Sequence, residues 1–217
     1  MATRLVMIYS RFERFWHWTQ MALIMLLMFS GFGMRGLHDL LPFDKAVMLH
    51  TVAALALVLL WLFAIFWHLT TGNWRHYVPS TRGLLAVIRF YAWGNLKGER
   101  HPYRKAYWRK HNAPQALTYL GLKLVLFPAV WLSGIAYLGY PLWDHLGGAS
   151  GALSWVALVH VIAAFAILAF VIIHVYLLTL GGPLREHVAP MINGFDKVDL
   201  SAEEEAYLQR DEPGHIR

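Results

Sequence analysis

Residues 153–180, LSWVALVHVIAAFAILAFVIIHVYLLTL, form a long apolar stretch that contains two histidines, His160 and His174, and no acidic or basic residue. A helix advances about 1.5 Å and 100° per residue. The two imidazoles therefore lie about 21 Å apart along the helix axis, and their directions around that axis differ by about 40°. Polar side chains inside a bilayer are costly, so an intramembrane histidine is a functional candidate. This spacing suits two stacked haems and not one shared ion. The simpler alternative is two histidines satisfied by neighbouring hydroxyl or carbonyl groups.

The composition is that of an integral membrane protein. Of 217 residues, 58% are hydrophobic and only 15% are charged, against about 25% charged in an ordinary soluble domain. Several apolar runs approach the length of about 20 residues that a helix needs to cross a bilayer. The sequence contains no cysteine, which excludes disulfides, iron–sulfur clusters and covalently attached c-type haem in this chain. Any haem would therefore be bound non-covalently.

Four apolar segments predict an all-α integral membrane four-helix bundle. The helices are expected at about residues 14–34, 45–69, 115–138 and 153–180. A polar segment, 70–115, separates the second helix from the third, and within it 83–96 has an amphipathic pattern that favours a position along the membrane surface. We expect 1–182 to form one membrane domain that includes this segment, and 183–217 to form a polar cytoplasmic tail. Within this tail, residues 201–217 are expected to be solvated and partly disordered. The N-terminus lacks the pattern of a removable signal peptide, so the first apolar segment is expected to stay as a membrane helix.

Basic residues are distributed unevenly around these helices. Three precede the first helix, nine lie between the second and third, and four follow the fourth. The connection between the first two helices has only Arg35 and Lys45, and the last loop has none. By the positive-inside rule, both termini and segment 70–115 face the cytoplasm. This distribution explains the net charge of +6 as that of a multi-pass membrane protein, with the lipid bilayer and not nucleic acid beside its basic loops.

With this topology, four histidines sort into two depths. His50 and His160 lie near the outer ends of their helices, whereas His17 and His174 lie near the cytoplasmic ends. Ligation by two histidines is typical of low-spin b-type haem, which passes single electrons because both axial positions are filled. Two such haems about 20 Å apart would carry electrons across the bilayer. His68 is the alternative inner ligand, about 27 Å beyond His50 on the same azimuth, although its position at the membrane boundary favours an interfacial role.

Other residues carry weaker signals. Small residues could let haem approach the backbone, although they are also common wherever membrane helices pack; they are Gly31, Gly33, Ala53, Ala54, Gly134, Ala163 and Ala164. Histidines in loops or the tail are expected to be solvated: His38, His76, His101, His111, His145, His187 and His215. A zinc site is less consistent with the pattern, because zinc ligands cluster within a few ångströms. A proton relay would be expected to include an acidic residue near the middle of the membrane, and these helices have none there.

Five motifs carry a family resemblance: RFERFWHW (11–18), VMLH (47–50), IFWHLTTGNW (65–74), KHNAPQ (110–115) and LVHVIAAFAILAFVIIHVYL (158–177). Together with the order of the four histidines, they resemble the cytochrome b membrane subunit (gamma subunit) of formate dehydrogenase-N. They also resemble the wider group of di-haem cytochrome b subunits that serve thiosulfate or tetrathionate reductases and nickel–iron hydrogenases. The resemblance covers most of residues 5–182, and the fourteen-residue histidine spacing is its most specific feature.

The resemblance implies a ligand set and a quinone site. His17 and His174 would ligate the cytoplasmic-side haem, and His50 and His160 the periplasmic-side haem. A menaquinone or ubiquinone pocket beside the inner haem is also implied, because family members carry an Asn-Ala-x-Gln motif there.

That motif falls at residues 112–115, with Pro114 where the formate dehydrogenase subunit has glycine. The amide groups of Asn112 and Gln115 could hydrogen-bond a quinone carbonyl at the membrane edge. The alternative is that these two side chains cap the third helix. Basic residues are further candidates for contact with haem propionates: Arg14 or Arg109 on the inside, and Arg35 or Lys45 outside.

The sequence therefore predicts a di-haem b membrane cytochrome subunit that relays electrons between a cytoplasmic-side quinone site and a periplasmic oxidoreductase partner. The partner would be an iron–sulfur or multihaem electron-transfer protein, docked near the outer haem on residues 35–38 and 138–153. The chain would oxidise or reduce quinone, while substrate chemistry belongs to the partner. Two alternatives stay open: a stand-alone di-haem quinol oxidoreductase, and a haem-free membrane anchor or transporter.

Overall fold

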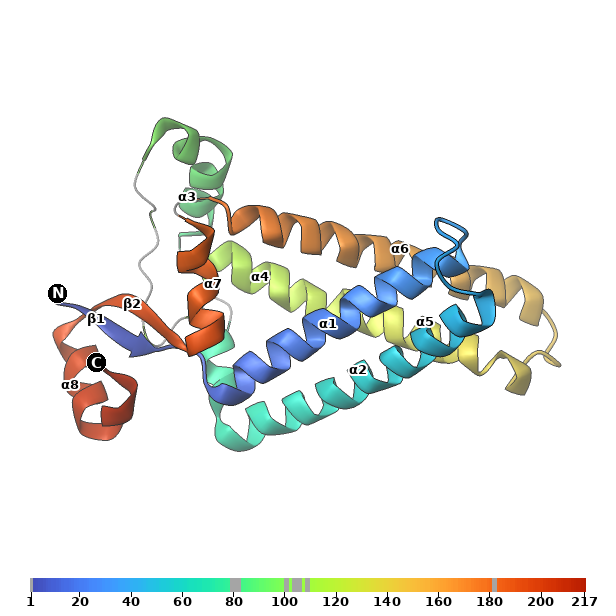
Figure 1. The fold of residues 1–217 in the computed structure, drawn as a ribbon, viewed down its shortest axis with the longest axis horizontal. Helices are drawn as coiled ribbons and strands as arrows, with labels where there is room; N and C mark the ends of the chain where they lie inside the picture. The colour runs from blue at the N-terminus through green and yellow to red at the C-terminus, as the bar shows by residue number, and fades with distance from the viewer. Residues whose placement is uncertain (1, 79–82, 100–101, 103–106, 108–109, 181–182) are drawn as a thin grey trace. The chain divides into compact units, whose positions relative to one another are not determined.

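The structure, a computed structural model, describes residues 2–78, 83–99, 102, 107, 110–180 and 183–217. The chain is mostly helical, as predicted, and a two-stranded sheet is the exception to the all-α expectation (Figure 1). It divides into two compact units, Met1–Ala116 with Leu178–Arg217, and Leu117–Leu177. Each unit is built on two long helices that pack against each other.

The helix pair of the first unit consists of α1 (Arg11–Met34) and α2 (Phe43–Thr71), which run antiparallel (Figure 1). At one end of the pair, Phe12 packs on Trp67 with 4.4 Å between ring centroids. Contacts between side chains continue to the other end, where the connection between the helices turns. The two helices therefore hold a fixed register along most of their length.

The ends of these helices have identifiable local causes. A reciprocal capping box between Ser10 and Glu13 satisfies backbone N–H groups at the start of α1, so the helix begins at Arg11 and not at the predicted residue 14. The second helix starts directly after Pro42 and ends at Gly72, which has a φ of 73°. This left-handed conformation is one that glycine adopts without steric cost, and it commonly terminates helices.

The third predicted helix is one continuous helical run with a π-helical turn in its middle. It consists of α4 (Ala113–Gly121), η4 (Leu122–Leu126) and α5 (Phe127–Leu138). Pro128 lies just after the π-helical turn, and a proline ring clashes with the carbonyl four residues earlier in a regular helix. The wider turn accommodates this proline without ending the helix.

The fourth predicted helix is α6 (Ala149–Leu177), which packs against α5 in the second unit. It is unbroken through both of its histidines and begins earlier than the predicted residue 153. A short helical turn, η5 (Tyr140–Leu142), lies in the loop before it. Helix α6 ends at Leu177, before the predicted end at residue 180, and residues 181–182 lie outside the described residues.

Three helical runs in the described part of the chain are long and apolar enough to cross a membrane: Phe43–Thr71, Ala113–Leu138 and Ala149–Leu177. The shorter α1, with 24 residues, is not among them and carries Arg11, Glu13 and Arg14 in its first turn. Its crossing of the membrane, and with it the four-helix bundle, stays a prediction.

The predicted polar tail is folded, and the expectation that it is partly disordered was wrong. It forms α7 (Leu184–Asn193), β2 (Phe195–Leu200), α8 (Ala202–Asp211) and a final turn, η6 (Pro213–His215). Strand β2 pairs antiparallel with β1 (Ala2–Met7), with Ala2 opposite Leu200 and Met7 opposite Phe195. The two ends of the chain thus build one structure, which neither end could form alone.

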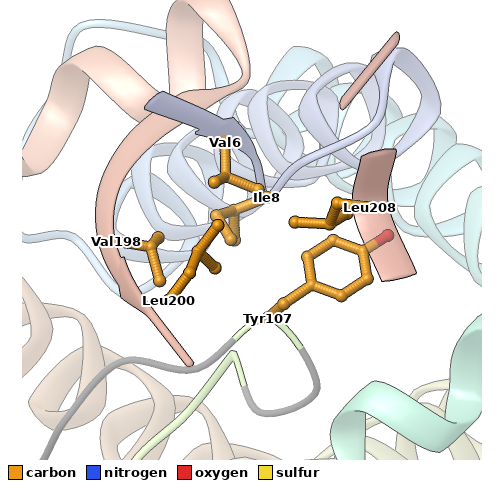
Figure 2. Close-up of a cluster of buried hydrophobic side chains, with 6 residues drawn as sticks. All are labelled: Val6, Ile8, Tyr107, Val198, Leu200 and Leu208. Atoms are coloured by element: carbon orange, nitrogen blue, oxygen red, sulfur yellow. The ribbon is translucent and has the colours of Figure 1, made fainter. Parts of the chain in front are cut away.

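A small hydrophobic core stabilises this sheet (Figure 2). Its members are buried side chains from both ends of the chain and one from the polar segment: Val6, Ile8, Tyr107, Val198, Leu200 and Leu208. On β2 the buried residues alternate with exposed ones, as expected for a strand that covers a core with one face.

The polar segment between the second and third helices contains short helical pieces. They are η1 (Asn73–Tyr77), α3 (Leu84–Arg89), η2 (Phe90–Gly94) and η3 (Asn95–Lys97). Val87 and Phe90 are buried, whereas Leu85, Trp93 and Leu96 are strongly exposed. The amphipathic character of residues 83–96 and their position along the membrane surface stay predictions.

Candidate functional site

His50 of α2 faces Ser30 of α1 inside the first helix pair. Its Nδ1 atom lies 3.0 Å from the hydroxyl oxygen of Ser30. That hydroxyl donates to the Leu26 carbonyl, one turn earlier in α1, at 2.7 Å. Ser30 is fully buried, so its hydroxyl links the imidazole directly to the backbone of the neighbouring helix.

His160 of α6 has the same arrangement in the second unit. Its Nδ1 atom lies 3.1 Å from the hydroxyl oxygen of Ser133 in α5. That hydroxyl in turn donates to the Ala129 carbonyl, one turn earlier. Two helix pairs far apart in the sequence thus hold a histidine in the same way.

A glycine follows the serine in both of these serine–histidine pairs, Ser30 with His50 and Ser133 with His160. A Cβ atom on Gly134 would lie 3.2 Å from Cε1 of His160, and a Cβ atom on Gly31 would lie 3.5 Å from Cε1 of His50. Both glycines therefore make room for an imidazole ring.

His38, in the connection between α1 and α2, folds back onto α1. Its ring stacks on Phe29, and its Nε2 atom lies 2.8 Å from the Phe29 carbonyl. A Cβ atom on Gly33 would lie only 2.8 Å from Cε1 of this ring. The expectation that His38 is solvated was wrong, and Gly33 makes room for this side chain.

The two inner histidines have aromatic neighbours. His174 stacks on Phe170, with ring centroids 5.8 Å apart and an interplanar angle of 15°. His17 lies edge-on to Trp18, with centroids 5.2 Å apart. Each predicted haem site would take one histidine from each unit. The pairing of His17 with His174 and of His50 with His160 stays a prediction.

Within each unit, the histidine positions lie at two levels with nearly the same separation. Because α1 is unbroken between His17 and Ser30, the level of the Ser30–His50 contact lies about 20 Å from that of His17. In α6, His160 and His174 are about 21 Å apart by the same geometry. The two helix pairs therefore match in the spacing of their histidines.

His68, the alternative inner ligand, is packed among aromatic rings. The rings of Trp16, Trp67 and Tyr77 lie with their centroids 5.1–5.4 Å from its own. Its Nδ1 atom lies 2.7 Å from the Ala64 carbonyl in the preceding turn. It lies about 27 Å from His50 along α2, which is further than the separation of the two levels in α6.

Asn112 and Gln115 form a capping box at the start of α4. The Asn112 side chain accepts from the N–H of Gln115 at 2.9 Å, and the Gln115 side chain accepts from the N–H of Asn112 at 3.2 Å. The Asn112 amide also lies 3.4 Å from the hydroxyl of Tyr91. The structure thus shows the capping role, and a contact with quinone stays a prediction.

A buried ion pair, which sequence reasoning missed, lies at the polar end of the first helix pair. Lys110 Nζ lies 2.6 Å from Glu13 Oε1, and the two side chains are 5% and 3% exposed. Tyr77 also donates a hydrogen bond to this carboxylate. Burial alone would raise the pKa of Glu13, but the charge of Lys110 and the hydrogen bonds from Lys110, Tyr77 and the Ser10 N–H outweigh it and hold that pKa below its ordinary value.

The basic residues considered for haem propionates have varied surroundings. The guanidinium group of Arg14 donates to the Ile192 carbonyl in α7. Arg35 and Lys45 are exposed at the other end of the helix pair. Arg109 lies outside the described residues.

The arrangement fits haem b better than a clustered metal site. Among the described residues, no group of three or more His, Asp or Glu side chains could hold a metal ion. Histidines at two levels on apolar helices instead supply separate imidazole ligands, and non-covalent haem b requires no cysteine. The described part of the chain is therefore a helical protein with three runs long and apolar enough to cross a membrane and with histidines that could ligate haem b.

Comparison with known proteins gives the class of this protein. The family model described as prokaryotic cytochrome b561 matches residues 8–194. The putative cytochrome YdhU of Escherichia coli (strain K12) is 30% identical over 201 residues, which cover 88% of this chain and 75% of that protein. No solved structure matches. The chain belongs to the prokaryotic cytochrome b561 family, and it is a haem b membrane electron-transfer protein.

Proposed function

We propose that the chain is a di-haem b cytochrome subunit of a bacterial inner membrane. It relays electrons between a quinone site on the cytoplasmic side and a periplasmic oxidoreductase partner, an iron–sulfur or multihaem protein. When bound, haem b supplies a one-electron carrier whose two axial positions are filled by imidazoles.

The matched spacing of the histidine levels carries this proposal. Levels about 20 Å apart in the first helix pair and about 21 Å apart in the second offer one imidazole from each unit at each of two depths. At the outer depth His50 and His160 would hold one haem, and at the inner depth His17 and His174 would hold the other. His68 remains the alternative inner ligand. Its backbone position lies about 27 Å from that of His50 along α2, whereas its ring contacts that of Trp16, the residue before His17.

The proposal requires α1 to cross the membrane as a fourth helix. Its 24 residues span about 36 Å, more than the roughly 30 Å of a hydrocarbon core. It also packs along α2, which is long and apolar enough to span a membrane. The charged residues of its first turn would lie at the cytoplasmic surface, in agreement with the positive-inside rule.

The quinone site is placed beside the inner haem, at the start of the third helix. The capping box occupies the side-chain oxygens of Asn112 and Gln115, whereas an amide group also has N–H donors, which can reach a quinone carbonyl. Strong burial of Asn112 holds its amide group in one orientation. Both residues thus combine a structural role with a proposed contact.

A quinol-reduction experiment tests the proposed function. Detergent-purified, oxidised protein is mixed anaerobically with menadiol or a short-chain ubiquinol, and the α-band of reduced haem b is followed by stopped-flow absorption. We expect reduction by quinol that a quinone analogue inhibits, with dithionite as the reference for complete reduction. Reduction by dithionite without any reduction by either quinol would contradict the quinone assignment.

A further inference from the structure

We propose that Ser30 and Ser133 are positioning residues that hold His50 and His160 with Nδ1 protonated, so that Nε2 of each ring is the nitrogen that binds iron. This inference rests on the proposed function. It adds which tautomer the two outer ligands adopt and which side chains impose it.

The hydrogen count of the Ser30 hydroxyl determines the direction of its contact with His50. A serine hydroxyl has one hydrogen and two acceptor lone pairs. That hydrogen points to the Leu26 carbonyl at 2.7 Å, so the contact of 3.0 Å with Nδ1 of His50 must be an N–H that donates to the hydroxyl. A neutral imidazole with a proton on Nδ1 carries its lone pair on Nε2.

The same count applies to His160. The hydrogen of Ser133 points to the Ala129 carbonyl, so the hydroxyl accepts from Nδ1 at 3.1 Å. This contact favours the tautomer with Nε2 as the ligand atom.

The arrangement occurs twice on helices that share no local sequence context. In both places a serine is followed by glycine, and its hydroxyl donates a hydrogen bond to the backbone carbonyl four residues earlier. The histidine lies on the following long helix. Yet twenty residues separate serine from histidine in one case and twenty-seven in the other. The glycines Gly31 and Gly134 border the rings on the side of Cε1, which further restricts their orientation.

The same contacts would satisfy a buried histidine that binds nothing, so the two roles must be separated by their effect on the haem. A ligand that donates its second ring N–H to an acceptor becomes a stronger base toward the metal. A stronger axial donor favours the oxidised iron and lowers the reduction potential. Loss of the serine hydroxyl should therefore raise the potential of the outer haem and leave that of the inner haem unchanged.

The test compares Ser30→Ala and Ser133→Ala with Ser154→Ala in the full-length protein purified in detergent. Ser154 is a matched control, since its hydroxyl bonds to the Ser150 carbonyl in the same way but is exposed on α6. The measurements are haem per polypeptide, redox titration of the α-band and the low-spin EPR g values. Ser30→Thr and Ser133→Thr keep the hydroxyl and serve as rescue variants.

We expect each alanine variant to shift the potential of one haem upward and to move its EPR signal, while the threonine variants and Ser154→Ala resemble the wild type. The double alanine variant should bind the outer haem about ten- to a hundredfold more weakly. If the wild type binds two haems but both alanine variants keep its potentials and g values, the inference about the serines is overturned and the proposed function is not. A wild-type protein without two haems would instead contradict the proposed function.

Discussion

The two helix pairs hold an outer histidine by the same contact but place the inner histidine differently. In the second pair, α6 carries both His160 and His174, so their separation follows from the geometry of one helix. In the first pair, His17 lies on α1 and His50 on α2, and their separation depends on how these helices are aligned. The Ser30–His50 and Phe12–Trp67 contacts show that alignment at the two ends of the pair. One spacing can therefore be calculated from sequence, whereas the other is a property of the folded hairpin.

The largest expected effect tests this difference directly. In His17→Ala the inner level loses its ligand from α1, so the protein should keep one haem of two. In His68→Ala both haems should remain, because His68 lies about 27 Å from His50 along α2, which is about 6 Å more than the separation of the two histidines in α6. Haem per polypeptide, measured after extraction from purified protein, gives both numbers.

The converse result would reassign the inner ligand. Retention of two haems in His17→Ala with loss of one in His68→Ala would show that the histidine levels of the two helix pairs do not match. His174→Ala serves as the reference for loss of the inner haem.

The polar end of the first helix pair offers the second test, because Glu13 and Lys110 join α1 to the segment that precedes the third helix. Removing one partner leaves a buried charge without its counterion, so Glu13→Gln should lower the free energy of unfolding by about 3–5 kcal/mol. The double variant Glu13→Gln/Lys110→Met should be less destabilised. Thermal unfolding in detergent checks both, and equal destabilisation of the single and double variants would contradict the account.

The same ion pair predicts a direction for pH dependence. The folded pKa of Glu13 lies below the ordinary value of 4.5, so its stabilising contribution is complete above about pH 4.5 and is lost as pH falls through the folded pKa. The wild type should therefore lose stability on acidification more steeply than Glu13→Gln. Melting temperatures recorded between pH 6 and pH 3 measure this difference.

A smaller and more local effect is expected in the paired chain ends. Leu208 is fully buried in the core beneath the sheet, so Leu208→Ala should cost roughly 2–5 kcal/mol locally. Leu96→Ala is the control, because Leu96 is 81% exposed. Hydrogen exchange of residues 2–9 should accelerate in the first variant only, with haem content unchanged. Loss of haem in Leu208→Ala would show that the paired ends also support the haem sites.

The smallest effect is expected on the EPR g values when Gly134 or Gly31 is replaced. A Cβ atom on Gly134 would come within 3.2 Å of His160, whereas one on Gly31 would meet His50 at an ordinary 3.5 Å. Gly134→Ala should therefore shift the EPR g values of the outer haem more than Gly31→Ala does. Gly121→Ala should resemble the wild type, because the added group would meet no side chain of the described residues within 4 Å, apart from those of its two chain neighbours. A shift in Gly121→Ala equal to that in Gly134→Ala would contradict this explanation.

Periodicity predicted most of the helical fold and the histidine positions, because both depend on residues close together in the sequence. It did not predict contacts between distant residues. Thr3 pairs with Asp199 across 196 positions, and no local pattern in a six-residue strand names such a partner. Lys110 and Glu13 are 97 positions apart, and no local pattern pairs them. The Ser-Gly dipeptides at 30–31 and 133–134 were a usable signal, but their relation to the histidines required the helix registers.

The most direct measurement is the number of haems per polypeptide in the wild-type protein, together with a dithionite-reduced minus oxidised spectrum. The account predicts two b-type haems with separate potentials in a redox titration. One haem would contradict the two-level assignment of the histidines. No haem in protein produced with sufficient haem supply would contradict the electron-relay function and favour a membrane anchor or transporter.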